Sequence, residues 1–328
     1  MNNLNQRLLY QQLQAILQAK LIVHKEKKYI KEFKQLIIMR RATEFVMVTL
    51  LQYVGLMLGT VPDEPIPVWP ASGVAIAMHF FRGNRIWPGL WFGGFLAYWI
   101  EGLNLEIAVC ISLVHVAEAI SIRFSIHRII GALVPMHRSV QVLEFFFLSF
   151  GITFLGSGII TALNSPNTFW ADPIRIQWFL NWFADFSGVI IFAPACLIWD
   201  AYLPGLAEQL KFSHRKLHAY LLGTVLVILN AALLLLNPFD LVYPLSMATI
   251  PLIFMAAYYF GQCGATLAAV FTAMIGVCNF ETNYQIFKAD HDHVYFLSIQ
   301  CKYCIEAGIA FYLATRKAEH SASFSRFG

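Results

Sequence analysis

Residues 142–163 read VLEFFFLSFGITFLGSGIITAL, an apolar run whose one charged side chain is Glu144. A helix rises about 1.5 Å per residue, so a run of this length can cross a hydrocarbon core about 30 Å thick. Backbone polar groups in lipid must be satisfied internally, and the run lacks the alternation of a barrel strand. The stretch therefore predicts a transmembrane helix.

Similar apolar stretches recur along most of the chain. They are expected at about 44–61, 68–81, 86–100, 105–122, 142–163, 178–199, 219–236, 243–260, 262–280 and 293–314. The second and third are short and begin near Trp-Pro pairs, so either could be tilted or partly re-entrant. We predict an all-α integral membrane protein, a polytopic bundle of about 8–10 transmembrane helices.

The composition agrees with lipid as the solvent. The chain is 58% hydrophobic and 13% charged, whereas a soluble domain carries roughly 25% charged residues. Six cysteines fall in or beside apolar segments, so no disulfide framework is expected. The basic stretches belong to loops beside the membrane, which predicts the lipid bilayer as a partner and no nucleic acid.

The charges also predict topology. If the N-terminus is cytoplasmic, basic residues gather on that side in every loop, as the positive-inside rule requires, and the C-terminus is cytoplasmic too. We divide the chain into a cytoplasmic amphipathic basic arm (1–41), an integral membrane domain (42–315) and a short cytoplasmic tail (316–328). The arm is either held on anionic lipid or is a dimerising or partner-binding helix.

The most specific motif is Trp69-Pro70-Ala71-Ser72-Gly73, followed by Trp87-Pro88-Gly89. Proline interrupts the helical hydrogen-bond ladder, and glycine lets neighbouring backbones approach closely. Packing alone would make this pair of segments a rigid structural element.

The order of these residues resembles the first type of bacterial membrane-associated sensor domain, the MASE family, found N-terminal to histidine kinases and diguanylate cyclases. A later aromatic-rich motif and a membrane-embedded glutamate before an arginine extend the resemblance over about residues 44–314. The matching residues are Trp178, Trp182, Asp185, Gly188, Pro194 and Trp199, together with Glu118 and Arg123.

The resemblance implies a non-catalytic sensory domain in the bacterial inner membrane, multi-pass, that passes a signal to a cytoplasmic output domain or partner protein. No cyclase signature, kinase phospho-acceptor region or nucleotide loop follows the last apolar segment. The output is therefore expected to be missing, truncated or supplied separately. We find no catalytic constellation, predict no catalytic residue and no cofactor, and expect no enzyme activity.

Placing an ionisable residue inside an apolar transmembrane segment costs free energy, so such residues are functional candidates by default. Glu118 and His115 share a helix face and either form a switch or a structural pair. Asp185 lies near Trp182 and either lines a ligand pocket or bonds a neighbouring helix. Arg85 is a candidate inner-face clamp.

Three further groups favour structural interpretations. Lys302 and Glu306 are four residues apart, which predicts an ion pair. The Cys301-x-x-Cys304 spacing favours packing over metal binding because no second ligand pair accompanies it. The Asp290-His291-Asp292-His293 stretch is expected to be an acidic solvated loop. No metal ligand set is predicted.

The leading functional hypothesis is a transmembrane sensor that detects a signal in the membrane or periplasm. The alternatives are a small-solute transporter, favoured by the intramembrane charges and prolines, and a membrane anchor or partner subunit. The sequence does not decide between a monomer and a homodimer.

Overall fold

The computed structural model describes residues 35, 37–57, 67–131, 136–165, 171–209, 224–225, 228, 232, 249–290 and 293–324. The chain divides into two units, Met1–Met47 and Val48–Gly328, and the candidate site lies within the second. Every regular element among the described residues is helical, which confirms the predicted all-α class.

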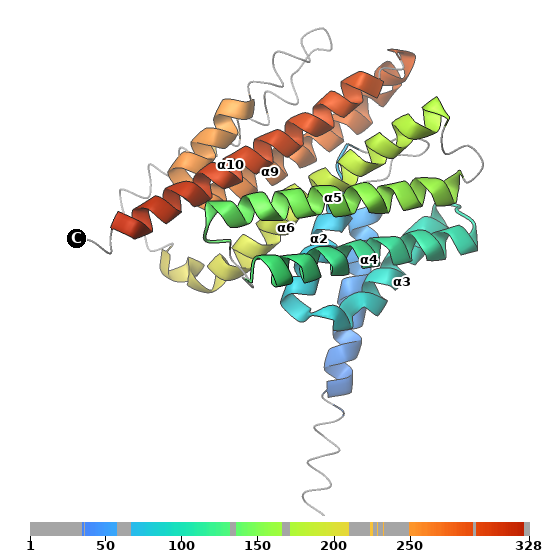
Figure 1. The fold of residues 1–328 in the computed structure, drawn as a ribbon, viewed down its shortest axis with the longest axis horizontal. Coiled ribbons are helices and arrows are strands. Elements are labelled where there is room, and N and C mark those ends of the chain that lie inside the picture. The colour runs from blue at the N-terminus through green and yellow to red at the C-terminus, as the bar shows by residue number, and fades with distance from the viewer. Residues whose placement is uncertain are drawn as a thin grey trace, which may run out of the picture. The chain divides into compact units, whose positions relative to one another are not determined.

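A first helix covers residues 37–57. The elements that follow it are α2 (Pro70–Arg82), η1 (Asn84–Ile86), α3 (Trp87–Ile100), α4 (Leu105–Ile129), α5 (Ser139–Asn164), α6 (Asp172–Gln209), α9 (Thr249–Asp290) and α10 (His293–Phe324) (Figure 1). The arm before residue 35, most of the predicted segment 219–236 and the side chains of the predicted Asp290–His293 loop lie outside the described residues.

Four of the described helices are long and apolar enough to cross a membrane. They run over Leu105–Ile129, Ser139–Asn164, Ile174–Tyr202 and Thr249–Val277. These spans support the polytopic membrane fold. By contrast, α2 and α3 have 13 and 14 residues, about 20 Å each at 1.5 Å per residue, so the predicted shortness of this pair is confirmed.

Local sequence explains where the short helices begin and end. Pro70 and Pro88 occupy first-turn positions of α2 and α3, where the missing N–H has no helical partner to lose. Gly83 ends α2 with a φ of 73°, a conformation that glycine adopts without steric cost. The same freedom produces a kink inside α9, where Gly261 has a φ of 63° at the predicted boundary between two segments.

Small residues set the packing of α2 against α6. A Cβ added at Gly188 would overlap the carbonyl of Trp69, and one added at Gly73 would overlap the carbonyl of Gly188. Close backbone approach of this kind is a common way to associate helices in lipid. Figure 1 shows α4 and α5 side by side, with α6 passing behind α5 in that view. The main core lies where α2, α4, α5, α6 and α10 meet.

Candidate functional site

A buried polar pair lies near the middle of α4. His115 follows the start of α4 by ten residues, about 15 Å along the helix axis. His115 and Glu118 share one face, and the His115 Nδ1 lies 3.1 Å from Glu118 Oε2, a distance for N–H donation to the carboxylate. Each residue is 8% exposed. The predicted proximity of the two side chains is confirmed.

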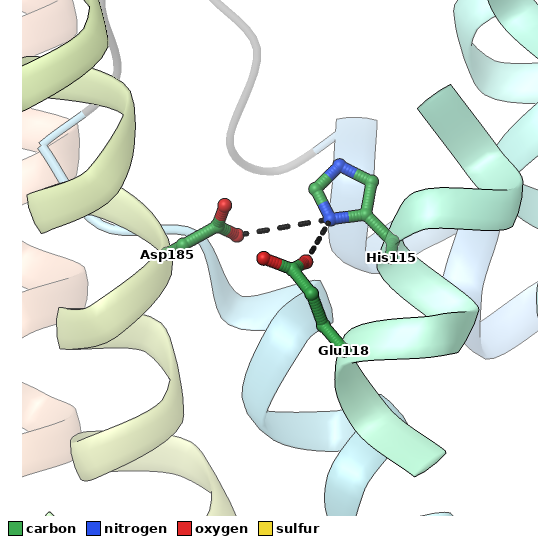
Figure 2. A group of neighbouring side chains, drawn as sticks. All are labelled: His115, Glu118 and Asp185. Carbon is green, nitrogen blue, oxygen red and sulfur yellow. Dashed lines mark hydrogen bonds and ion pairs between the residues drawn. The ribbon is translucent and has the colours of Figure 1, made fainter. Parts of the chain in front are cut away.

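A second carboxylate reaches the pair from α6. Asp185 Oδ1 lies 3.9 Å from His115 Nδ1, and Asp185 is 1% exposed. The ligand atoms of His115, Glu118 and Asp185 all lie within 4.8 Å of one another. Figure 2 shows the two carboxylates converging on the imidazole from different helices. We name these three residues the carboxylate–histidine cluster.

Two hydroxyl groups hold the cluster in place. The Ser72 hydroxyl on α2 donates to Asp185 Oδ1 at 2.5 Å. The Tyr98 hydroxyl on α3 lies 2.7 Å from His115 Nε2, and the Trp69 ring packs edge-on against the imidazole with centroids 5.2 Å apart. Side chains from α2, α3, α4 and α6 therefore meet at one point.

On the side of α5, a glycine borders the carboxylate–histidine cluster. A Cβ added at Gly156 would overlap the Glu118 carboxylate. Any other residue at this position would have to displace the carboxylate or separate α4 from α5. The glycine therefore gives the Glu118 side chain its room.

The cluster has more acceptor atoms than donors. Glu118 Oε1 and Asp185 Oδ2 are buried and have no hydrogen-bond partner in the described part of the chain. No lysine or arginine among the described residues forms an ion pair with either carboxylate. Buried polar atoms are normally satisfied, so this arrangement suits a proton, a cation or a ligand that brings its own donors.

Two predicted site residues lie away from the cluster contacts. The Trp182 indole N–H donates to the Phe150 carbonyl at 3.1 Å, which ties α6 to α5. Arg85 is exposed on η1. Its neighbour Asn84 accepts a hydrogen bond from Arg123 at 3.1 Å, so this contact joins η1 to α4. A clamp role for Arg85 stays a prediction.

The predicted structural residues fall into two groups. Trp69, Ser72, Gly73 and Gly188 meet at the α2–α6 contact beside the cluster, and Pro70 begins α2 next to Trp69. The others lie elsewhere in the bundle: exposed Trp87, Pro88 at the start of α3, buried Gly89 and buried Pro194. The Gly89 carbonyl accepts from the Thr49 hydroxyl at 3.2 Å, which connects α3 to the first helix.

Tyr98 and Gly156 were not predicted as site residues. Each is an ordinary component of an aromatic or glycine-containing apolar segment, and only the fold brings them to the cluster. Ser72 was predicted as part of a packing motif, whereas its hydroxyl also binds Asp185.

A second buried pair lies on α10, and a hydroxyl from α9 bonds to it. Lys302 Nζ is 3.4 Å from Glu306 Oε1, as the spacing predicted. The Thr249 hydroxyl donates to the same carboxylate oxygen at 3.0 Å. The charge of Glu306 is therefore compensated by a lysine, unlike the charges of the cluster, although Glu306 Oε2 has no hydrogen-bond partner in the described part of the chain.

Comparison with known proteins shows that the chain matches one family model. The family model described as MASE1 matches residues 42–305. No curated protein and no solved structure matches the chain.

Proposed function

Because this chain belongs to the MASE1 family of membrane-associated sensor domains, we propose that its carboxylate–histidine cluster receives the signal and that α10 transmits it. The cluster supports this proposal best. It places three ionisable side chains from two helices in a buried site where two carboxylate oxygens have no partner among the described residues. Intramembrane groups of this kind usually serve a function.

A direct chain of contacts supports the route to α10. Phe186 follows Asp185 on α6, and its ring packs edge-on against Phe146 of α5 with centroids 4.8 Å apart. Phe146 in turn packs against Gly308 of α10, where an added Cβ would lie 2.9 Å from the ring. A change in the position of Asp185 would therefore reach α10 through tightly packed rings.

A second contact joins α6 to α10 directly. The Gln300 side chain of α10 donates to the Leu180 carbonyl of α6 at 3.1 Å, and Gln300 is fully buried. Leu180 lies between one and two turns before Asp185 on the same helix. Movement of this part of α6 would act on α10 without passing through α5.

The last part of α10 is where we expect an output to be reached. Near this end, Glu319 accepts from the Ser139 hydroxyl at 2.9 Å, and Lys317 donates to the Tyr258 carbonyl at 2.5 Å. Figure 1 shows the start of α5 and the end of α10 at the same end of the bundle. Under the positive-inside rule this end would face the cytoplasm of a bacterium, with an output domain or partner bound there.

Hydrogen exchange of the full chain in lipid nanodiscs tests the proposal. Asp185→Asn replaces a carboxyl group of the cluster with an uncharged amide and should change amide exchange in residues 315–324 of α10. Glu106→Gln is the control because it removes an exposed carboxylate from the same helix as Glu118. Equal exchange in the wild type and both variants would contradict transmission from the cluster to α10.

A further inference from the structure

We propose that the carboxylate–histidine cluster is a binding site for a divalent transition-metal ion, with His115 Nδ1, Glu118 and Asp185 as its protein ligands. The inference rests on the proposed function, since it assigns a chemical class to the signal received at the same site. The spacing of residues in the sequence gave no indication of it, because the ligands come from α4 and α6.

The geometry is close to that of a coordination sphere. Ligand atoms about 2.1 Å from a tetrahedral ion lie about 3.4 Å apart. The two distances from His115 Nδ1 are 3.1 Å to Glu118 and 3.9 Å to Asp185. All three ligand atoms lie within 4.8 Å of one another, so small side-chain adjustments suffice.

The surroundings resemble the outer shell of a metal site. A metal-binding histidine commonly uses its second ring nitrogen to bond a neighbouring acceptor, which orients the ring. Here His115 Nε2 lies 2.7 Å from the Tyr98 hydroxyl, leaving Nδ1 directed at the carboxylates. The Ser72 hydroxyl donates to Asp185 Oδ1, the oxygen that lies 3.9 Å from His115 Nδ1, and so fixes the position of this carboxylate.

Charge favours a divalent cation over an uncharged ligand. When both carboxyl groups are ionised and the imidazole is neutral, the ligand set carries a charge of −2, which a bound divalent ion cancels. Buried charge is costly unless it is paired or coordinates a metal, and the described residues supply no lysine or arginine partner. The unpartnered oxygens, Glu118 Oε1 and Asp185 Oδ2, provide further acceptor capacity, and Figure 2 shows the free oxygen of Glu118 on the side toward Asp185.

The donor types narrow the choice of metal. One imidazole nitrogen with two carboxylates suits Zn²⁺, Mn²⁺, Fe²⁺ or Co²⁺, whereas Mg²⁺ and Ca²⁺ prefer oxygen ligands. Three protein ligands would leave a position for water or a second ligand. We use Zn²⁺ and Co²⁺ as probes.

Metal content of the full chain in nanodiscs tests the inference. After treatment with a chelator, the protein is dialysed against micromolar Zn²⁺, and bound zinc per chain is determined by mass spectrometry. Wild type should retain about one ion more than nanodiscs without protein. His115→Gln, Glu118→Gln and Asp185→Asn should each lower the affinity at least about tenfold. Co²⁺ should give visible absorption bands that the same variants lose.

His79→Gln is the control. His79 is also a fully buried histidine, but its Nδ1 bonds the Ala75 carbonyl of its own helix, so this variant should bind as the wild type does. Binding of no Zn²⁺ or Co²⁺ by folded wild type would overturn the inference. So would equal binding by the three cluster variants, which would assign the ions to surface groups. Neither result depends on α10, so the sensor proposal is tested separately.

Discussion

The Ser72 hydroxyl on α2 lies 2.5 Å from the Asp185 carboxylate on α6, although 113 residues separate them in the chain. This bond joins the short proline-initiated helix to the most buried of the four long apolar helices and connects the packing motif to the cluster. Its removal is therefore a specific test of how the cluster is held.

Ser72→Ala should destabilise the protein by about 1–3 kcal/mol, because it leaves a buried carboxylate without its hydrogen-bond donor. Ser112→Ala is the matched control, since the Ser112 hydroxyl donates to the Ala108 carbonyl of its own helix, and it should cost less than about 0.5 kcal/mol. Reversible unfolding in mixed detergent micelles measures both. Equal losses would show that the Ser72 bond contributes little.

Two glycines of α5 should respond to alanine in opposite directions. Gly156→Ala places a methyl group against the Glu118 carboxylate and should destabilise the protein by about 1–3 kcal/mol while weakening Zn²⁺ binding. A Cβ at Gly151 meets nothing within 4 Å, so Gly151→Ala should stabilise the helix by up to about 1 kcal/mol. Unfolding and Zn²⁺ titration of both variants check the contrast. A Gly156→Ala variant with the same free energy of unfolding as the wild type would mean that the Glu118 side chain can adopt another conformation.

The buried ion pair of α10 should depend on both partners. Glu306→Leu leaves the Lys302 ammonium buried without its carboxylate and should cost about 3–5 kcal/mol. Lys302→Met combined with Glu306→Leu should cost much less, because no charge is left uncompensated. A double-mutant cycle by unfolding measures the coupling. If the losses in the free energy of unfolding caused by the two single substitutions add up to the loss in the double variant, Lys302 and Glu306 do not interact directly.

The contact near the end of α10 should weaken in acid. Hydrogen bonds from the Ser139 backbone N–H and hydroxyl lower the pKa of the Glu319 carboxyl below its usual value. A depressed folded-state pKa stabilises the fold above the unfolded-state pKa, and that contribution disappears as pH falls through the folded-state pKa.

The comparison of wild type with Glu319→Gln isolates this contribution. The wild type should melt at a higher temperature than the variant at pH 7, and the difference should shrink toward zero as the pH falls below 4, about the usual carboxyl range. Melting curves over this pH range measure it. A difference that stays constant with pH would exclude an ionised Glu319 as its cause.

Much of the fold could be predicted from the sequence because lipid allows few alternatives. The length of the apolar runs predicted the helices, and the Trp-Pro pairs predicted the short α2 and α3. The boundary expected between segments 243–260 and 262–280 is the kink of α9 at Gly261. The His115–Glu118 contact also followed, since helical spacing alone brings these side chains together.

The rest of the site depends on tertiary packing. Asp185 was recognised as unusual, but neither Ser72 nor His115 could be assigned as its neighbour, because periodicity does not say which helices touch. Tyr98 and Gly156 carry no sequence signal beyond those of an apolar segment. The ligand set that we propose for a metal ion could not be assembled from the sequence for the same reason, because its residues lie on two helices.

Control of α10 by the cluster is tested most directly by measuring the distance between the ends of α4 and α10 when the cluster is altered. Spin labels carried by noncanonical amino acids at exposed Arg128 and Ala318 would report it by pulsed electron resonance in nanodiscs. We predict that Asp185→Asn and Glu118→Gln shift the distance distribution while Glu106→Gln leaves it as in the wild type. Identical distributions in all four proteins would contradict the claim that the cluster controls α10.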